Sequence, residues 1–227
     1  MRQKQSLATV TLGGIAAILS VSFAACANLS GSSATPPDQT TAESMPGMDH
    51  SSGGMNGSMN MDLGPKDDTF DLRFIDGMTP HHQGAVEMAQ EAIQKSQRSE
   101  IQQLAKAIIA AQQQEISQMQ DWRKTWYPTM PDTPMMYDAS MGHMMPMSDS
   151  MRSSMMMSGD LGAADEQFDL RFLNAMIPHH EGALDMANQA LQKSSRSEIT
   201  QMAQAILSSQ QQEIDQMQQW RKDWYGQ

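Results

Sequence analysis

One helical hairpin is written twice in this chain, and the duplication limits the folds that the chain can adopt. Adding 98 to any position from 68 to 127 gives its partner without a gap, and 38 of these 60 positions are identical. Each copy holds two runs of apolar residues at helical spacing, roughly 70–95 and 100–126 in the first copy. One hairpin cannot bury its apolar stripe alone, so we predict an all-α, ferritin-like four-helix bundle built from the two hairpins. Two separate hairpins that pair between molecules are the alternative.

The chain outside the two copies has a different composition. Residues 1–25 begin with basic side chains and continue in a charge-free run that ends in SFAACA, which is typical of a cleaved secretory signal. We therefore predict a periplasmic or secreted protein with no membrane span after cleavage. An uncleaved membrane anchor, or a lipid anchor at Cys26, is the alternative. The remaining divisions are a Met-rich flexible segment at 26–67, hairpin repeats at 68–127 and 166–227, and a Met-rich flexible linker at 128–165.

The charge of the chain restricts its partners. There are 26 acidic and 15 basic residues, which give a net charge of −11. Such an acidic surface disfavours nucleic acid and anionic membranes as partners and is compatible with metal ions. Because Cys26 is the only cysteine, the chain has neither a disulfide framework nor a thiolate cluster.

Two adjacent histidines follow a proline in each copy, in MTPHHQGAVEMA (78–89) and MIPHHEGALDMA (176–187). At 100° per residue, His81 and His82 fall on the apolar stripe of the first helix, and Glu115 falls on the stripe of the second. Burial of such groups costs a few kcal/mol each unless they find partners. Either they hydrogen-bond to one another, or they bind a ligand.

Methionine accompanies each histidine pair, and the whole chain has 24 methionines. Thioether sulfur is a poor ligand for zinc, calcium or magnesium, but together with imidazole it suits a soft ion such as Cu(I) or Ag(I). A thioether also needs no deprotonation to bind a metal. We therefore predict copper, as Cu(I), with silver as its surrogate. The predicted inward-facing ligands are His81, His82, Met78, Met88, Glu115 and Met119 in the first copy, and His179, His180, Met176, Met186, Glu213 and Met217 in the second.

The segments outside the copies repeat this chemistry at looser spacing, in MPGMDH (45–50), MGHMMPM (141–147) and SMMM (154–157). A low-complexity spacer, or a sacrificial site for methionine oxidation, is the alternative interpretation. The weaker ligand candidates are Met45, Met48, His50, Met141, His143, Met144, Met145 and Met147.

The phrases PHHxGAxxMA and QxxEIxxMxxW, placed in a duplicated hairpin, resemble an exported helical-bundle family that is labelled a domain of unknown function. The resemblance covers both repeats. It implies a ferritin-like four-helix bundle that binds Cu(I) and Ag(I) and serves copper resistance. The family motif falls on His81, His82, Met88, Glu115 and Met119, and on His179, His180, Met186, Glu213 and Met217.

We therefore predict a periplasmic copper-binding protein, not an enzyme, that sequesters copper or transfers it. Its expected partners are metal ions and a copper donor or acceptor protein in the periplasm. A ferritin-like di-iron or di-manganese oxidase is the main alternative. Such bundles place Glu-x-x-His pairs on their helices, a spacing that does not occur around the four helical histidines. A purely structural or adaptor role is a further alternative.

Overall fold

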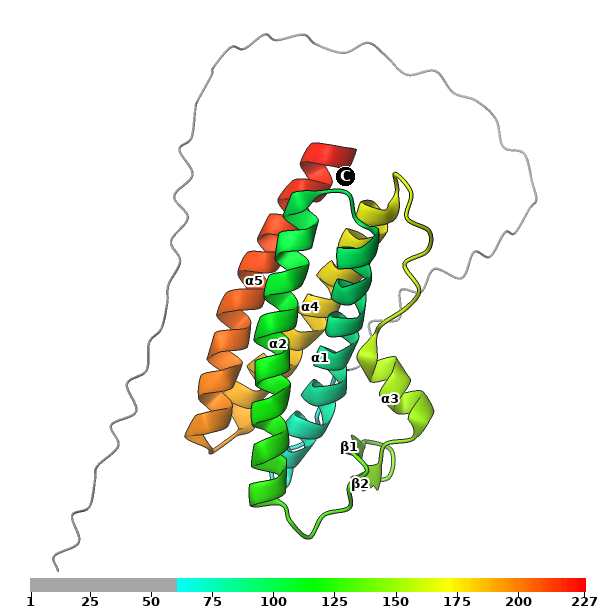
Figure 1. Cartoon of the computed structure of the whole chain (residues 1–227). Helices are drawn as coiled ribbons and strands as arrows, with labels where there is room; N and C mark the ends of the chain where they lie inside the picture. The colour runs from blue at the N-terminus through cyan, green and yellow to red at the C-terminus, as the bar shows by residue number, and fades with distance from the viewer. Residues whose placement is uncertain (1–60) are drawn as a thin grey trace, which may run out of the picture. The chain divides into compact units, whose positions relative to one another are not determined.

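The structure, a computed structural model, describes residues 61–227. Four long helices run side by side: α1 (Phe70–Lys95), α2 (Ser99–Trp126), α4 (Phe168–Lys193) and α5 (Ser197–Tyr225) (Figure 1). The predicted all-α bundle of two hairpins is thereby confirmed. The predicted signal at 1–25 and most of the segment at 26–67 lie outside the described residues. Among the described helices, none has the length and apolar character to span a membrane.

The linker at 128–165 differs from its prediction because it contains regular structure. Strands β1 (Met135–Asp138) and β2 (His143–Pro146) form an antiparallel hairpin, and α3 (Asp149–Met156) follows. A local hydrogen bond helps α3 to form, because the Ser148 hydroxyl caps the helix by accepting from the Met151 N–H. Figure 1 shows the hairpin and α3 on the α1 side of the bundle. We call residues 128–160 the strap.

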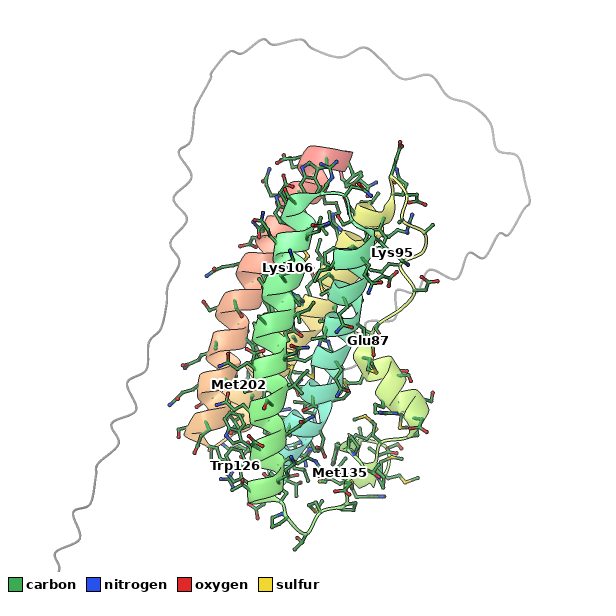
Figure 2. The ribbon with its side chains drawn as sticks, in the orientation of Figure 1. Glu87, Lys95, Lys106, Trp126, Met135 and Met202 are labelled. Atoms are coloured by element: carbon green, nitrogen blue, oxygen red, sulfur yellow. The ribbon has the colours of Figure 1, made fainter. Side chains whose placement is uncertain are left out.

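A buried ion pair fixes the strap to α1. Arg123 Nε donates to Asp76 Oδ1 at 2.5 Å, and the Met135 N–H donates to Asp76 Oδ2 at 2.8 Å. Asp76 is only 2% exposed, and Met135 lies in the hairpin beside the lower part of α1 (Figure 2). The second copy has Asn174 at the position of Asp76, and Asn174 is exposed. The aspartate is therefore the feature of the first copy that holds the strap.

The two copies also hold each other. Each contributes an arginine that pairs with an aspartate of the other copy and lies over one of its tryptophans, which supports a single bundle rather than separate hairpins. The contacts are Arg98 with Asp169 (3.3 Å) and Trp224 (4.2 Å), and Arg196 with Asp71 (3.4 Å) and Trp126 (4.3 Å).

A short arm precedes each first helix and extends the duplication beyond the predicted start at residue 68. The sequence Asp-Leu-Gly recurs at 62–64 and 160–162, and both glycines have φ of +83°. Each arm is bound by its own first helix and by a lysine of the other copy. The bonds run from Arg73 to the Leu63 carbonyl (2.6 Å), Arg171 to Leu161 (2.5 Å), Lys193 to Gly64 (2.7 Å) and Lys95 to Gly162 (2.6 Å).

Small side chains allow α1 and α4 to pack directly against each other. Alanines recur at helical spacing on both helices, and each is fully buried: Ala85, Ala89 and Ala92 on α1, and Ala183, Ala187 and Ala190 on α4.

Two apolar clusters make up the core, one toward each end of the bundle. Along α1, one cluster reaches Met78 and the other begins at Ala85. Along α4 the order is reversed, and the corresponding boundaries are Ile177 and Ala183. α1 and α4 are therefore antiparallel, and both histidine pairs lie at the level between the clusters.

We expect Asp76→Asn to loosen the strap while the bundle keeps its helices. The substitution removes the charge that Arg123 and the Met135 N–H both contact, and loss of one partner of a buried ion pair costs about 3–5 kcal/mol. Limited proteolysis should cut within 128–160 faster than in the original chain. Asp149→Asn, at a side chain 98% exposed, is the matched control. Equal cleavage rates in the two variants would contradict this anchor.

Candidate metal centre

Four buried histidines cross the middle of the bundle. His81 and His82 on α1, and His179 and His180 on α4, are each 0% exposed. The rings of His81 and His179 meet at the centre, with centroids 3.9 Å apart. Their sequence neighbours lie farther out, at 6.5 Å from His81 to His82 and 6.2 Å from His179 to His180. Residues 98 apart thus take equivalent places about an approximate two-fold axis between the central rings.

The outer histidines each bond a glutamate of their own hairpin. His82 Nε2 lies 2.8 Å from Glu115 Oε2, and His180 Nε2 lies 2.7 Å from Glu213 Oε2. A carboxylate only accepts hydrogen bonds, so Nε2 carries a proton in both rings, and the neutral form of each ring has its lone pair on Nδ1. These are hydrogen bonds between the inward-facing groups, the arrangement that the sequence left open as the alternative to a bound ligand.

The central histidines have different surroundings. His179 Nε2 donates to the Met156 carbonyl oxygen at 3.1 Å. His81 has no hydrogen-bond partner within residues 61–227 at either ring nitrogen, and Nδ1 of the other three histidines likewise has none there. The four histidines therefore carry five buried ring nitrogens that have no partner among the described residues.

Burial keeps the central imidazoles neutral. Desolvation, with the nearby His180 and His82 rings, lowers the pKa of His179 to about 3. Desolvation and the adjacent His179 hold the pKa of His81 well below its usual value. A neutral imidazole has a free lone pair at pH 7, which is the form that binds a metal.

The methionines are grouped differently from the prediction of one ligand set per hairpin. Met78 and Met88 are ten residues apart, which is about 15 Å along a helix. Because α1 and α4 are antiparallel, each apolar cluster draws its sulfurs from both copies. One cluster contains Met78 and Met119 with Met186 of the second copy, and the other contains Met176 and Met217 with Met88 of the first.

Two further methionine side chains lie beside the histidines and were absent from the predicted ligand sets: Met61 of the first arm and Met157, which follows α3. Met156 reaches the same place with its backbone carbonyl, and the Met155 methyl lies beside Gly77. Figure 2 labels Glu87 where the chain after α3 passes α1, and there the Ser158 hydroxyl donates to Glu87 Oε2 at 2.9 Å. The SMMM phrase at 154–157 marked Met155, Met156 and Met157 in the sequence, but composition alone did not indicate which helix they pack against.

The strap separates the weaker ligand candidates. In the β1–β2 register Met136 faces Met145 and Asp138 faces His143, so alternation places His143 and Met145 on one face of the hairpin and Met144 on the other. Met147 is buried at 5% exposure and Met141 is 68% exposed. Met45, Met48 and His50 lie outside the described residues.

The donor types present at this level favour a soft ion. Across residues 61–227 no three side chains of the His, Cys, Asp and Glu types are grouped so as to hold a metal. A metal here would therefore take thioether sulfur together with imidazole nitrogen, which is a donor set for Cu(I) or Ag(I).

The depressed histidine pKa values predict that the metal-free fold loses stability as the pH falls. In the unfolded chain both histidines titrate near 6.5, whereas folded His179 stays neutral down to a pKa of about 3. Below pH 6.5 the unfolded state binds more protons, so the free energy of unfolding falls by about 1.4 kcal/mol per pH unit for each histidine. Urea unfolding between pH 7 and pH 5 measures this slope.

Replacement of both central histidines, as His81→Gln with His179→Gln, should flatten that slope. His143→Gln, at an exposed hairpin position, should leave the slope unchanged. An unchanged slope in the double variant would contradict the assignment of the neutral pair.

The chain is similar to a known family and to solved structures of one relative. The family model DUF305, a domain of unknown function, matches residues 71–221. The structure is similar to CopM in its Cu(I)-bound form, with 35% identity, 68% of this chain and 97% of that chain covered, and a TM-score of 0.54. The Cu(II)-bound form of CopM is 38% identical with a TM-score of 0.55, and the Ag-bound form obtained by soaking is 34% identical with a TM-score of 0.53. Both comparisons cover 68% of this chain and 97% of the CopM chain. No curated protein matches the chain.

Proposed function

The chain belongs to the DUF305 family, and on that premise we propose that it is a periplasmic protein that binds Cu(I), and Ag(I) in its place, through buried histidine and methionine side chains. The observation that carries the proposal is the set of nitrogens on His81, His82, His179 and His180 that have no partner within residues 61–227. Buried polar atoms without partners are rare because each costs about 1–3 kcal/mol. Metal ions bound at more than one place would give these nitrogens partners.

The donors available around the histidines support copper. Sulfurs of both copies lie in the apolar clusters on either side of the histidine level, and thioether with imidazole is a soft donor set. CopM, a relative that is 34–38% identical, has structures in Cu(I)-bound, Cu(II)-bound and Ag-bound forms. The family resemblance and the local chemistry therefore indicate the same ion.

Glu115 and Glu213 support the outer histidines as ligands. A carboxylate that accepts a hydrogen bond from Nε2–H fixes the ring orientation and raises the basicity of Nδ1, as is usual for metal-binding histidines. Both glutamate side chains are 19% exposed, so their charge is partly solvated. In the proposed centre these glutamates position the histidines rather than bind the ion.

The protein acts by binding, in this proposal, and not by turnover. It sequesters excess copper in the periplasm, or hands it to a copper acceptor protein, and thereby contributes to copper resistance. The secretory signal expected at 1–25 supports this compartment for the proposal, because outside the cytoplasm a thioether keeps its ligand capacity and a free thiol tends to be oxidised.

We expect the protein to bind more than one Cu(I) per chain, as measured by anaerobic competition with a chromogenic Cu(I) chelator. Replacement of His81, His82, His179 and His180 by Gln should remove the tightest sites, because it removes every imidazole of the central level. His143→Gln, at a weaker candidate outside the bundle, should keep the tightest sites and serves as the control, and far-UV circular dichroism verifies the helices. Unchanged tight binding in the fourfold variant would refute these sites.

The oxidase alternative requires a separate test. Anaerobic loading with Fe(II), followed by exposure to air, should give no oxo-bridged absorption, because carboxylate and histidine donors are not grouped for a metal within residues 61–227. A clear di-iron spectrum would overturn the copper proposal.

A further inference from the structure

The environments of the two central histidines are not equivalent, although the axis relates them. The Met156 carbonyl oxygen contacts Gly84 so closely that a Cβ there would overlap with it, and the same oxygen accepts from His179 Nε2. The equivalent glycine in the second copy is Gly182. His81 Nε2 lies beside it, and no oxygen or nitrogen accepts or donates there among the described residues.

Thioethers lie beside Gly182 instead. A Cβ at this residue would stand 3.1 Å from His81 Nε2, 3.3 Å from the Met61 methyl carbon and 3.7 Å from the Met157 sulfur. The missing side chain therefore leaves a small space that one imidazole nitrogen and two methionine ends border. The Met155 methyl is more distant from it, since it lies beside Gly77.

Met61 is held in place by its backbone. Gln189 Nε2 donates to the Met61 carbonyl at 2.8 Å, and the Leu63 N–H donates to Gln189 Oε1 at 2.9 Å. Gln189 lies on α4, so the arm is fixed to the same helix as Gly182. The equivalent of Met61 in the second copy is Gly159, which has no side chain. The thioether is thus present only on the side where the imidazole has no partner.

Met157 has an unusual backbone conformation. It ends α3 with φ of +47°, and it is the only described residue other than glycine with positive φ. This left-handed conformation costs roughly 1–2 kcal/mol in a residue with a Cβ, and helices usually place glycine or asparagine there. The strap nevertheless holds methionine at this point, and the Met157 sulfur borders the space at Gly182.

We infer that His81 Nε2, the Met61 sulfur and the Met157 sulfur together bind one Cu(I) or Ag(I) in the space left by Gly182. The inference rests on the proposed function, because it assigns ligands for the same ion, and it adds two sulfurs that lie outside the duplicated hairpins. A neutral imidazole with two thioethers is a soft set for a monovalent ion. Within residues 61–227 the second copy has no equivalent of this site, since Gly159 replaces Met61 and the Met156 carbonyl occupies the place beside Gly84.

Titration with Ag(I) tests the inference, because this ion is redox-stable. In the double variant Met61→Leu with Met157→Leu, one Ag(I) site should weaken at least about tenfold, since loss of even an outer-shell partner typically costs 10–100-fold in metal affinity. Met151→Leu, at a 37% exposed position of the same helix α3, should match the original chain. Gly182→Ala should weaken the same site with both sulfurs retained, because its Cβ fills the space.

NMR of methionine methyl groups labelled with ¹³C adds a direct readout in the unsubstituted chain. The Met61 and Met157 resonances, assigned from the two single variants, should shift together as Ag(I) is added, and the Met151 resonance should not. If the original chain binds Ag(I) and these two resonances stay fixed, or the double variant binds as tightly, the inference fails and the proposed function stands. If the original chain binds neither Ag(I) nor Cu(I), both fail.

Discussion

The contact between His81 and His179, at the centre of the bundle, is the constraint on which the other features depend. Two imidazoles with ring centroids 3.9 Å apart and no solvent exposure can be accommodated only if they are neutral. The alanines and glycines of α1 and α4 allow the two helices to approach closely enough for this contact. The apolar clusters on both sides exclude water from it. Neutral, unsolvated nitrogens are a cost to folding without a ligand and an advantage for binding a soft ion.

Duplication supplies the frame, and divergence between the copies supplies the asymmetry. The bonds from His82 to Glu115 and from His180 to Glu213 are the same interaction in both copies. The strap breaks this symmetry. Asp76 of the first copy binds the strap, whereas no described segment packs in the same way on Asn174, its equivalent in the second copy. As a result the strap covers α1, where Pro80 is buried, and leaves Pro178 on α4 exposed.

The helical period of the sequence predicted the features that depend on one hairpin alone. The four helices, the inward direction of His81 and its neighbours, and the proximity of Glu115 all follow from a period of 3.6 residues within one copy. The partners of Met88 did not follow, because one helix's phase does not specify which helix lies opposite or in which direction it runs. The strap's position was also unpredictable. It depends on Asp76 and Arg123, which are distant in sequence from the methionines that the strap delivers.

The proposed ligands belong to different parts of the structure, and this bears on how a metal ion could leave the site. The imidazoles belong to α1 and α4, and Met61, on the arm that Gln189 holds, is buried in one of the core clusters, whereas Met157 belongs to the strap and is only partly buried against that cluster. Opening of the strap would therefore withdraw the Met157 sulfur, together with the Met156 carbonyl that accepts from His179, while Met61 stays in the core. Segments with few buried apolar contacts, such as α3, open at lower free energy than the core does. A site of the proposed composition can release a soft ion through movement of the strap, while the four-helix bundle remains folded.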